Sequence, residues 1–281
     1  MSSPLDNGES PRPVSSTWTF ALPVIGFAIG VVGALCGIGG GLFATPLLNL
    51  GVGLPLPSAI ATSLVLVFST ASSATVNEAL SPDSVILWKL AFAVAAGAFV
   101  GARAGFKVVQ RLGASKLTLI FGLFLVYAGV RMILPSSADD LLPPEQPLHW
   151  LQLAKAFGVG LLGGTVSPMM GIGGGVVMVP GLTLLLPELG FPAARAATLA
   201  AATVGASRGI FLYSKRRRVQ WRYGLLLGAG AVMGATVGNQ LTNLDGAASI
   251  GKQLLGVLVL FVSIRYLVGA WKEHAAKAVT G

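Results

Sequence analysis

The chain has 281 residues, of which 54% are hydrophobic and only 10% are charged, and its mean hydropathy is +0.78. A soluble domain needs a much larger charged surface, so the composition predicts an integral membrane protein in contact with a lipid bilayer. The net charge of +9 would point to nucleic acid in a soluble protein. Here the basic residues gather in short loops, as the positive-inside rule describes, and we expect no nucleic-acid partner.

Catalytic and metal-binding groups are absent from the apolar segments. The ten acidic residues fall in tails, connections or the last turn of a segment, the two histidines fall in connections, and Cys36 is the single cysteine. These positions offer no Ser-His, Cys-His or paired-carboxylate site and no cluster of metal ligands. We therefore expect neither an enzyme nor a metal site.

The phrase GIGGG occurs twice inside apolar stretches, at residues 37–41 and 171–175. Glycine costs about 1 kcal/mol per residue in a helix relative to alanine, so each phrase predicts a point where a helix stops. In lipid, a stopped helix is tolerated only where its free backbone groups face protein, water or a ligand. The predicted substrate site therefore contains the glycines of both phrases: Gly37, Gly39, Gly40, Gly41, Gly171, Gly173, Gly174 and Gly175.

The expected elements follow in chain order. Residues 1–17 form a polar tail without the basic start of a secretory signal, so we expect the next segment to stay in the mature protein. Residues 18–134 form a first membrane repeat that begins with the broken segment 18–53, either a re-entrant hairpin or a full span plus a half-helix. Three further helices are expected at residues 57–80, 85–108 and 116–134.

Residues 135–148 carry four prolines and three acidic residues and separate two halves of the chain. The second half, residues 149–271, repeats the first, and residues 272–281 form a tail. GIGGGLFATPLLNL matches GIGGGVVMVPGLTL at an offset of 134 residues, and two later matches follow at 133 and 134. Three matches in one order predict a tandem duplication.

Corresponding loops of the two repeats carry opposite charge. The connection after residues 57–80 contains Glu78 and Asp83, whereas its counterpart contains residues 215–218, Lys-Arg-Arg-Arg (the KRRR loop). Because Lys and Arg in short loops stay cytoplasmic, equivalent loops must lie on opposite faces. We therefore predict an all-α polytopic membrane protein with two inverted-topology repeats, each a broken helix or hairpin plus three transmembrane helices. Both termini are expected in the cytoplasm, and inversion favours the hairpin.

A half-helix that begins after a break would direct free backbone N–H groups and its positive dipole end toward the membrane centre, which suits an anion. Inverted repeats with interrupted helices are typical of secondary transporters, whose substrate site lies near the midplane. We therefore expect a small anionic substrate. The alternative, that the glycines only permit tight packing, is less favoured because packing motifs place glycine at every fourth residue, as at 97–105 and 230–238.

Other candidate contacts lie on the helices that follow the breaks. Thr62 and Ser63 align with Ala197 and Thr198, and their hydroxyls would donate to substrate oxygens or to a neighbouring helix. Four basic residues lie within the expected spans, and snorkelling toward the membrane surface is the favoured interpretation of each: Lys89, Arg103, Arg195 and Arg208. Arg208 is the best candidate for a substrate contact, because it lies deepest from the KRRR loop.

Two apolar GxGGG(x)₄P phrases, each followed by a Pro-x-Ala helix start with Thr or Ser before Leu and by a glycine-rich GAxxGAxxG helix, resemble the TauE/SafE sulfite-exporter family of membrane permeases. The resemblance extends over about residues 20–268. It implies export or uptake of a small sulfur-containing anion, such as sulfite, a sulfonate or thiosulfate, with inverted halves and no organic cofactor. Ala197 departs from the pattern, because its counterpart Thr62 carries a hydroxyl.

The sequence thus predicts a secondary transporter in the plasma membrane, with export favoured and alternating access around the two breaks. A passive anion channel is the first alternative, and saturable flux with counterflow would distinguish the two. A membrane scaffold or enzyme is the second. The anion, the coupling ion and the oligomeric state, a homo-oligomer included, stay open.

Overall fold

The computed structural model describes residues 16–279, except residues 113, 135–147, 172, 243 and 245. Every regular element in this part of the chain is a helix, so the predicted all-α class is confirmed. Nearly all of the predicted linker, residues 135–148, lies outside the described residues, as do residues 1–15 of the amino-terminal tail.

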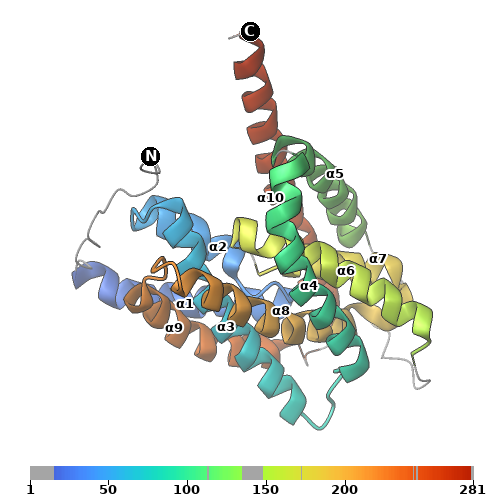
Figure 1. The fold of residues 1–281 in the computed structure, drawn as a ribbon. Helices are drawn as coiled ribbons and strands as arrows, with labels where there is room; N and C mark the ends of the chain where they lie inside the picture. Colours follow the sequence, from blue (N-terminus) through green and yellow to red (C-terminus); the bar gives the residue numbers. More distant parts are fainter. Residues whose placement is uncertain are drawn as a thin grey trace.

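Each half consists of a broken helix followed by three long helices (Figure 1). The first half contains α1 (Ser16–Cys36), α2 (Gly41–Pro46), the π-helix η1 (Leu47–Gly51), α3 (Leu56–Leu80), α4 (Trp88–Leu112) and α5 (Ala114–Ile133). The second half contains α6 (Trp150–Met170), α7 (Gly175–Leu185), the 3-10 helix η2 (Pro187–Leu189), α8 (Gly190–Ser214), α9 (Trp221–Leu241) and α10 (Ala247–Val279). The last helix continues through most of the segment expected to be a carboxy-terminal tail.

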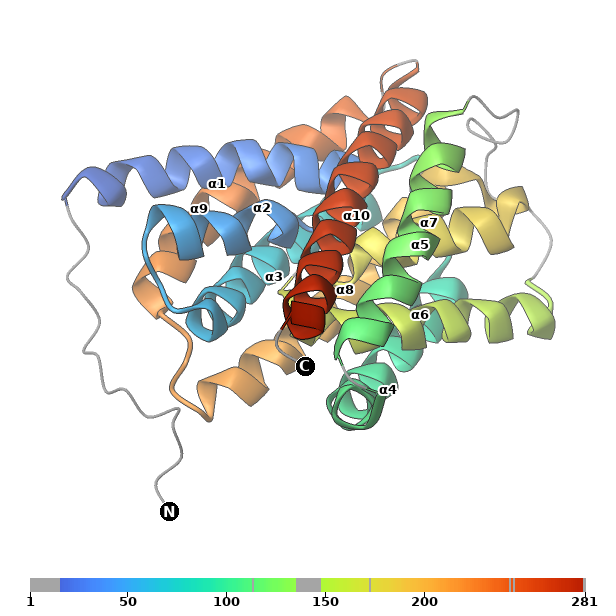
Figure 2. The same cartoon turned by 90° about the horizontal axis from the view of Figure 1, so that it is seen from above.

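The two halves pack by exchanging partners. The first α-helix of each half lies against the fourth α-helix of the other half, so α1 packs on α9 and α6 packs on α4. α3 and α8 pack on each other between these pairs, and α5 packs on α10 at one side of the molecule (Figures 1 and 2). The breaks of α1–α2 and α6–α7 are thereby brought into the interior beside α3 and α8.

Glycine rows make the α1–α9 and α4–α6 contacts close. A Cβ added at Gly97 or Gly101 of α4 would collide with the backbone of α6, and one at Gly230 or Gly234 of α9 would collide with the backbone of α1. Small residues let two helix backbones approach closely, and the resulting van der Waals packing favours helix association in lipid. The prediction that these glycine rows are packing faces is confirmed.

Within the described residues, two helical segments are long and apolar enough to cross a membrane, Leu56–Leu80 and Ala247–Ile264. A third candidate is a bent pair, Gly175–Leu185 with Pro187–Ser214, whose two parts meet at 99°. This bend lies between α7 and α8, beyond the second glycine break.

Candidate functional site

Three equivalent glycines of the two GIGGG phrases have the same left-handed backbone conformation. In the first, Gly37, Gly39 and Gly40 have positive φ angles of 76°, 70° and 80°. The equivalent glycines of the second, Gly171, Gly173 and Gly174, have φ of 68°, 77° and 78°. Side chains rarely tolerate this left-handed region, so the glycines end α1 and α6 and let α2 and α7 start in new directions. The predicted helix breaks are confirmed at both phrases.

The two breaks touch each other. A Cβ added at Gly175 would lie 2.6 Å from Cα of Ile38 and 2.7 Å from the carbonyl oxygen of Gly37. Both phrases also contact one side chain of α3: an added Cβ would lie 3.0 Å from Cγ1 of Val67 at Gly39 and 2.6 Å from it at Gly173. The glycines are therefore needed for close approach as well as for backbone conformation, and no open space separates them at this crossing.

Hydroxyl groups of the first half hold the second break. Ser63 Oγ accepts a hydrogen bond from Thr45 Oγ1 at 2.9 Å and lies 3.0 Å from the carbonyl oxygen of Gly171 and 2.8 Å from that of Ile60. All of these atoms belong to buried residues or to the break itself. In this conformation Ser63 therefore links two helices, which is one of the two roles considered from the sequence.

The other two candidate hydroxyls differ from each other. Thr62 Oγ1 accepts a hydrogen bond from the backbone N–H of Gln220 at 3.0 Å, so it fastens α3 to the start of α9. Thr198 is fully buried, and its Oγ1 has no hydrogen-bond partner within the described part of the chain. Because a buried hydroxyl without a partner is costly, Thr198 is the better candidate for a ligand contact.

Arg195 supports the first break. Its side chain contacts Gly37, since a Cβ added there would lie 2.8 Å from Cγ of Arg195. Its guanidinium donates to Glu78 Oε2 at 2.7 Å, to Asn239 Oδ1 at 3.1 Å, to the Ala34 carbonyl oxygen at 3.1 Å and to Thr242 Oγ1 at 3.3 Å. Arg195 is only 2% exposed. The expectation that it snorkels to the membrane surface is wrong, because a carboxylate distant in sequence pairs with it inside the protein.

Lys89 and Arg103, in contrast, are exposed, as snorkelling requires. Arg208 is partly buried and lies over the aromatic ring of Phe99 in α4, with Cζ 4.0 Å from the ring centroid. This cation–π contact offsets part of the cost of placing the charge between helices. Arg208 Nε has no hydrogen-bond partner within the described residues, so the guanidinium keeps a donor for another group.

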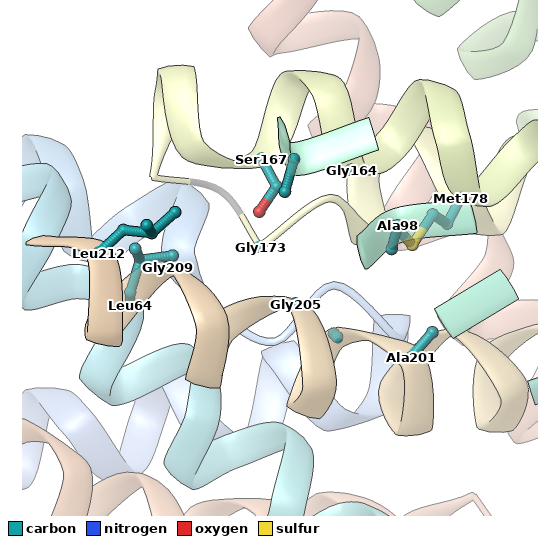
Figure 3. A pocket seen from close by; sticks show the side chains of 12 residues that line it. Leu64, Ala98, Gly164, Ser167, Gly173, Met178, Ala201, Gly205, Gly209 and Leu212 are labelled. Atoms are coloured by element: carbon teal, nitrogen blue, oxygen red, sulfur yellow. The ribbon is translucent and has the colours of Figure 1, made fainter. Parts of the chain in front are cut away.

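A narrow cavity lies beside the second break (Figure 3). Its wall is made mainly of small and aliphatic residues from α3, α4, α6, α7 and α8: Leu64, Ala98, Ala102, Gly164, Ser167, Gly173, Met178, Ala201, Ala202, Gly205, Gly209 and Leu212. The space open to the centre of a water-sized sphere is about 10 Å³, which holds roughly one water molecule. Ser167 is 5% exposed, and its hydroxyl oxygen points from α6 into the gap toward α8.

The structure places the predicted site residues around this cavity in different ways. Gly173 lines it, Gly39 contacts the same Val67 side chain as Gly173, and Gly175 meets Gly37 where the two breaks cross. Thr198 shares a face of α8 with the lining residues Ala201 and Gly205, and Arg208 shares one with Gly205 and Leu212, because residues three, four and seven apart lie on one side of a helix. Thr62 and Ser63 lie outside the lining.

Sequence reasoning missed Ser167 and the small residues of α8. Ser167 stands in Thr-Val-Ser-Pro just before the second break, where the first repeat has Gly33. That departure from the repeat was an available signal. The row Ala201, Gly205 and Gly209 repeats every fourth residue, a spacing that predicts only close packing. Which stretch of such a row borders a cavity depends on the neighbouring helices.

Comparisons with known proteins give one matching family and several relatives. The family model described as "Sulfite exporter TauE/SafE" matches residues 21–156 and 156–280, which is nearly the whole chain. A "probable membrane transporter protein" of Xylella fastidiosa is 27% identical over 255 residues, covering 90% of this chain and 95% of that protein. YunE of Bacillus subtilis, with the same description, is 28% identical over 243 residues, covering 77% of this chain and 86% of its own. No solved structure gives a significant match.

Proposed function

Because this chain belongs to the TauE/SafE sulfite exporter family, we propose that it is a secondary transporter that exports a small sulfur-containing anion, such as sulfite or an organosulfonate. The two halves alternate around a site beside the crossing of the two glycine breaks. The observation that carries this proposal is the cavity at the second break, where Ser167 and Gly173 face a space enclosed by helices of both halves.

Two observations support alternation of inverted halves in the plasma membrane. The broken helices have matching backbone angles, and the helix contacts exchange so that α1–α9 corresponds to α6–α4. Repeats that pack in this way can exchange conformations, as rocking of one half against the other requires. The opposite charges of corresponding loops support a cytoplasmic location for the KRRR loop and both termini.

The polar groups near the cavity fit an anion. Ser167 Oγ can donate one hydrogen bond, Thr198 Oγ1 is without a partner within the described residues, and Arg208 keeps its Nε donor. α7 begins at Gly175 with Gly174 as its N-cap, and no side chain caps its first turn. The positive end of this helix dipole therefore lies next to the cavity and favours negative charge.

The cavity is too small for an oxoanion as it stands, since it holds about one water. We infer that the structure corresponds to a nearly closed state and that the walls from α4, α6 and α8 move apart when substrate enters. The lining permits such movement, because it is rich in glycine and alanine and has few interlocking side chains.

The direct test is transport by the purified protein in liposomes. We expect uptake of radiolabelled sulfite to saturate and to be stimulated by unlabelled sulfite inside the vesicles, which is the counterflow of a transporter. Linear flux without counterflow would indicate a channel. Absence of flux for sulfite, thiosulfate, sulfoacetate and taurine alike would refute the substrate class.

Substituting Ser167 tests the assigned cavity. We expect Ser167→Ala to raise KM for the transported anion by about tenfold, because one hydrogen bond to a charged group contributes roughly 1.5 kcal/mol. Ser263→Ala is the matched control, since Ser263 is also buried, in α10, and donates a hydrogen bond to the carbonyl oxygen of Val259 in its own helix. An unchanged KM in Ser167→Ala would remove this cavity from the site.

The inverted topology has its own test. Single cysteines in residues 135–148 and in the KRRR loop should react with an impermeant thiol reagent from opposite faces of the membrane, in a Cys36→Ala background. Reaction of both from the same face of intact cells would overturn the inversion.

A further inference from the structure

Beyond the cavity, four helices meet in two stacked layers. The apolar layer consists of small or aliphatic buried side chains from α1, α3, α8 and α9: Ala34, Ala71, Ala74, Leu199, Ala202 and Ala235. One of its members, Ala202, also lines the cavity. The apolar layer therefore begins where the cavity ends.

The polar layer lies one helical turn further along the same helices. Glu78 follows Ala74 by four residues on α3, Asn239 follows Ala235 by four on α9, and Arg195 precedes Leu199 by four on α8. Residues four apart lie on one face of a helix, so the polar groups stack directly on the apolar ones. Arg195 connects the layer through its bonds to Glu78, Asn239 and the carbonyl oxygen of Ala34. Both charged groups are within the protein, at 3% and 8% side-chain exposure.

Three of the six positions in the apolar layer have counterparts in the other repeat that line the cavity instead. With α3 aligned on α8 at an offset of 135 and α4 on α9 at 133, the counterparts of Ala74, Leu199 and Ala235 are Gly209, Leu64 and Ala102. All three counterparts line the cavity. These three helix positions are thus closely packed at one end of the α3–α8 pair and border a cavity at the other.

The ion pair has no counterpart at the hollow end. The positions equivalent to Arg195 and Glu78 are Ile60 and Tyr213, and an isoleucine side chain cannot form an ion pair. The cavity extends along α8 from Ala201 to Leu212, close to the KRRR loop that follows Ser214. The hollow end is therefore the KRRR end, and the closed end is the end of the α3–α4 connection, residues 81–87.

We propose that the two layers form a gate which closes the transport path at the α3–α4 end, and that the Arg195–Glu78 ion pair holds this gate shut and separates once in each transport cycle. The inference rests on the proposed transport function. Two buried charges separate only where water reaches both, because an unpaired charge in the interior is costly. The pair therefore makes opening all-or-none. With no equivalent pair at the KRRR end, the empty protein stays shut at the α3–α4 end and loads from the KRRR end, which suits export.

The experiment measures access to the gate without any substrate. A reporter, Ala74→Cys, is placed in a Cys36→Ala background, and its modification by a charged, impermeant methanethiosulfonate is timed from each face, in right-side-out and inverted vesicles. The pair is then neutralised with Glu78→Gln and Arg195→Met together. This double change leaves no unpaired charge and keeps most of the side-chain volume.

We expect the reporter to react at least tenfold faster from the α3–α4 face after neutralisation. A second reporter, Ala128→Cys in α5, is equally buried and should keep its rate. An unchanged rate at Ala74→Cys would overturn the gate. An equal acceleration at both reporters would also overturn it, because the pair would then stabilise the whole fold. Gated access in a protein that moves no sulfur anion would refute the proposed substrate and leave the gate standing.

Discussion

The two glycine breaks have nearly identical backbones but are held by different chemistry. Gly37 packs against Arg195 and Val179, whereas the equivalent Gly171 packs against Thr45, Ser63 and Ile60. In the aligned repeats, Val179 stands where Thr45 does and Arg195 stands where Ile60 does. Left-handed glycines are the only residues that satisfy this backbone without strain, so they are the same in both copies. The side chains that contact the breaks differ between the copies. A charged residue, Arg195, contacts the first break, and two hydroxyl residues, Thr45 and Ser63, contact the second.

The largest expected effect comes from removing the charge of Arg195, which packs against the first glycine break. We expect Arg195→Met alone to lower the free energy of unfolding by about 3–5 kcal/mol, because Glu78 would be left buried and unpaired. Adding Glu78→Gln should restore much of this loss. Denaturant titration in detergent micelles measures both. Arg103→Met is the control, since Arg103 is exposed and should change stability by less than about 0.5 kcal/mol. A double variant as unstable as the single one would contradict the assigned role of the pair.

The second expected effect comes from alanine at two equivalent glycines, Gly40 and Gly174, which have nearly the same φ angle. Gly40→Ala and Gly174→Ala should each cost about 1–2 kcal/mol of stability for the left-handed conformation. Gly40→Ala should cost more, because its Cβ would lie 2.5 Å from Cγ2 of Ile29, whereas at Gly174 the nearest atom, 2.9 Å away, is the flexible end of Met178. Leucine at either position should abolish transport while the protein still inserts.

Thermal unfolding of purified variants measures the stability difference, with Gly158→Ala as the control. Gly158 is helical and an added Cβ there meets nothing within 4 Å, so its substitution should be neutral or slightly stabilising. Equal losses for Gly40→Ala and Gly174→Ala would show that their surroundings do not differ in effect. Unchanged transport with leucine would remove these glycines from the site.

The smallest expected effect is the difference in stability between variants of two aligned hydroxyl residues, Ser63 and Thr198. We expect Ser63→Ala to lower stability by about 1 kcal/mol, because the Gly171 carbonyl loses a donor. Thr198→Val should leave stability nearly unchanged or raise it, since its hydroxyl has no partner to lose within the described chain. Reduced transport in a stable Thr198→Val variant would place Thr198 in contact with the substrate. A destabilised Thr198→Val variant would contradict the unpartnered hydroxyl.

Some of these features follow from the sequence because they depend on residue types at fixed, local spacing. Apolar segments of helical length predicted the all-helical class, runs of glycine predicted both breaks, and glycines at every fourth residue predicted that α4 and α9 each have a packing face. Comparing the repeats predicted the duplication. Each of these features depends on the backbone preference of a residue type or on the period of a helix. Both can be read directly from the amino-acid sequence.

The choice of partners was decided by the tertiary structure. Arg195 and Glu78 are separated by 117 residues, and each alone resembles a charge near the end of a span. Ser63 and Thr198 occupy equivalent positions, yet among the residues that the structure describes only Ser63 meets hydrogen-bond partners, because the two breaks present different neighbours. Ser167 and the alanines of α8 border a cavity only because α4 and α6 close around them. Such contacts depend on the three-dimensional crossing of helices, which local spacing does not specify.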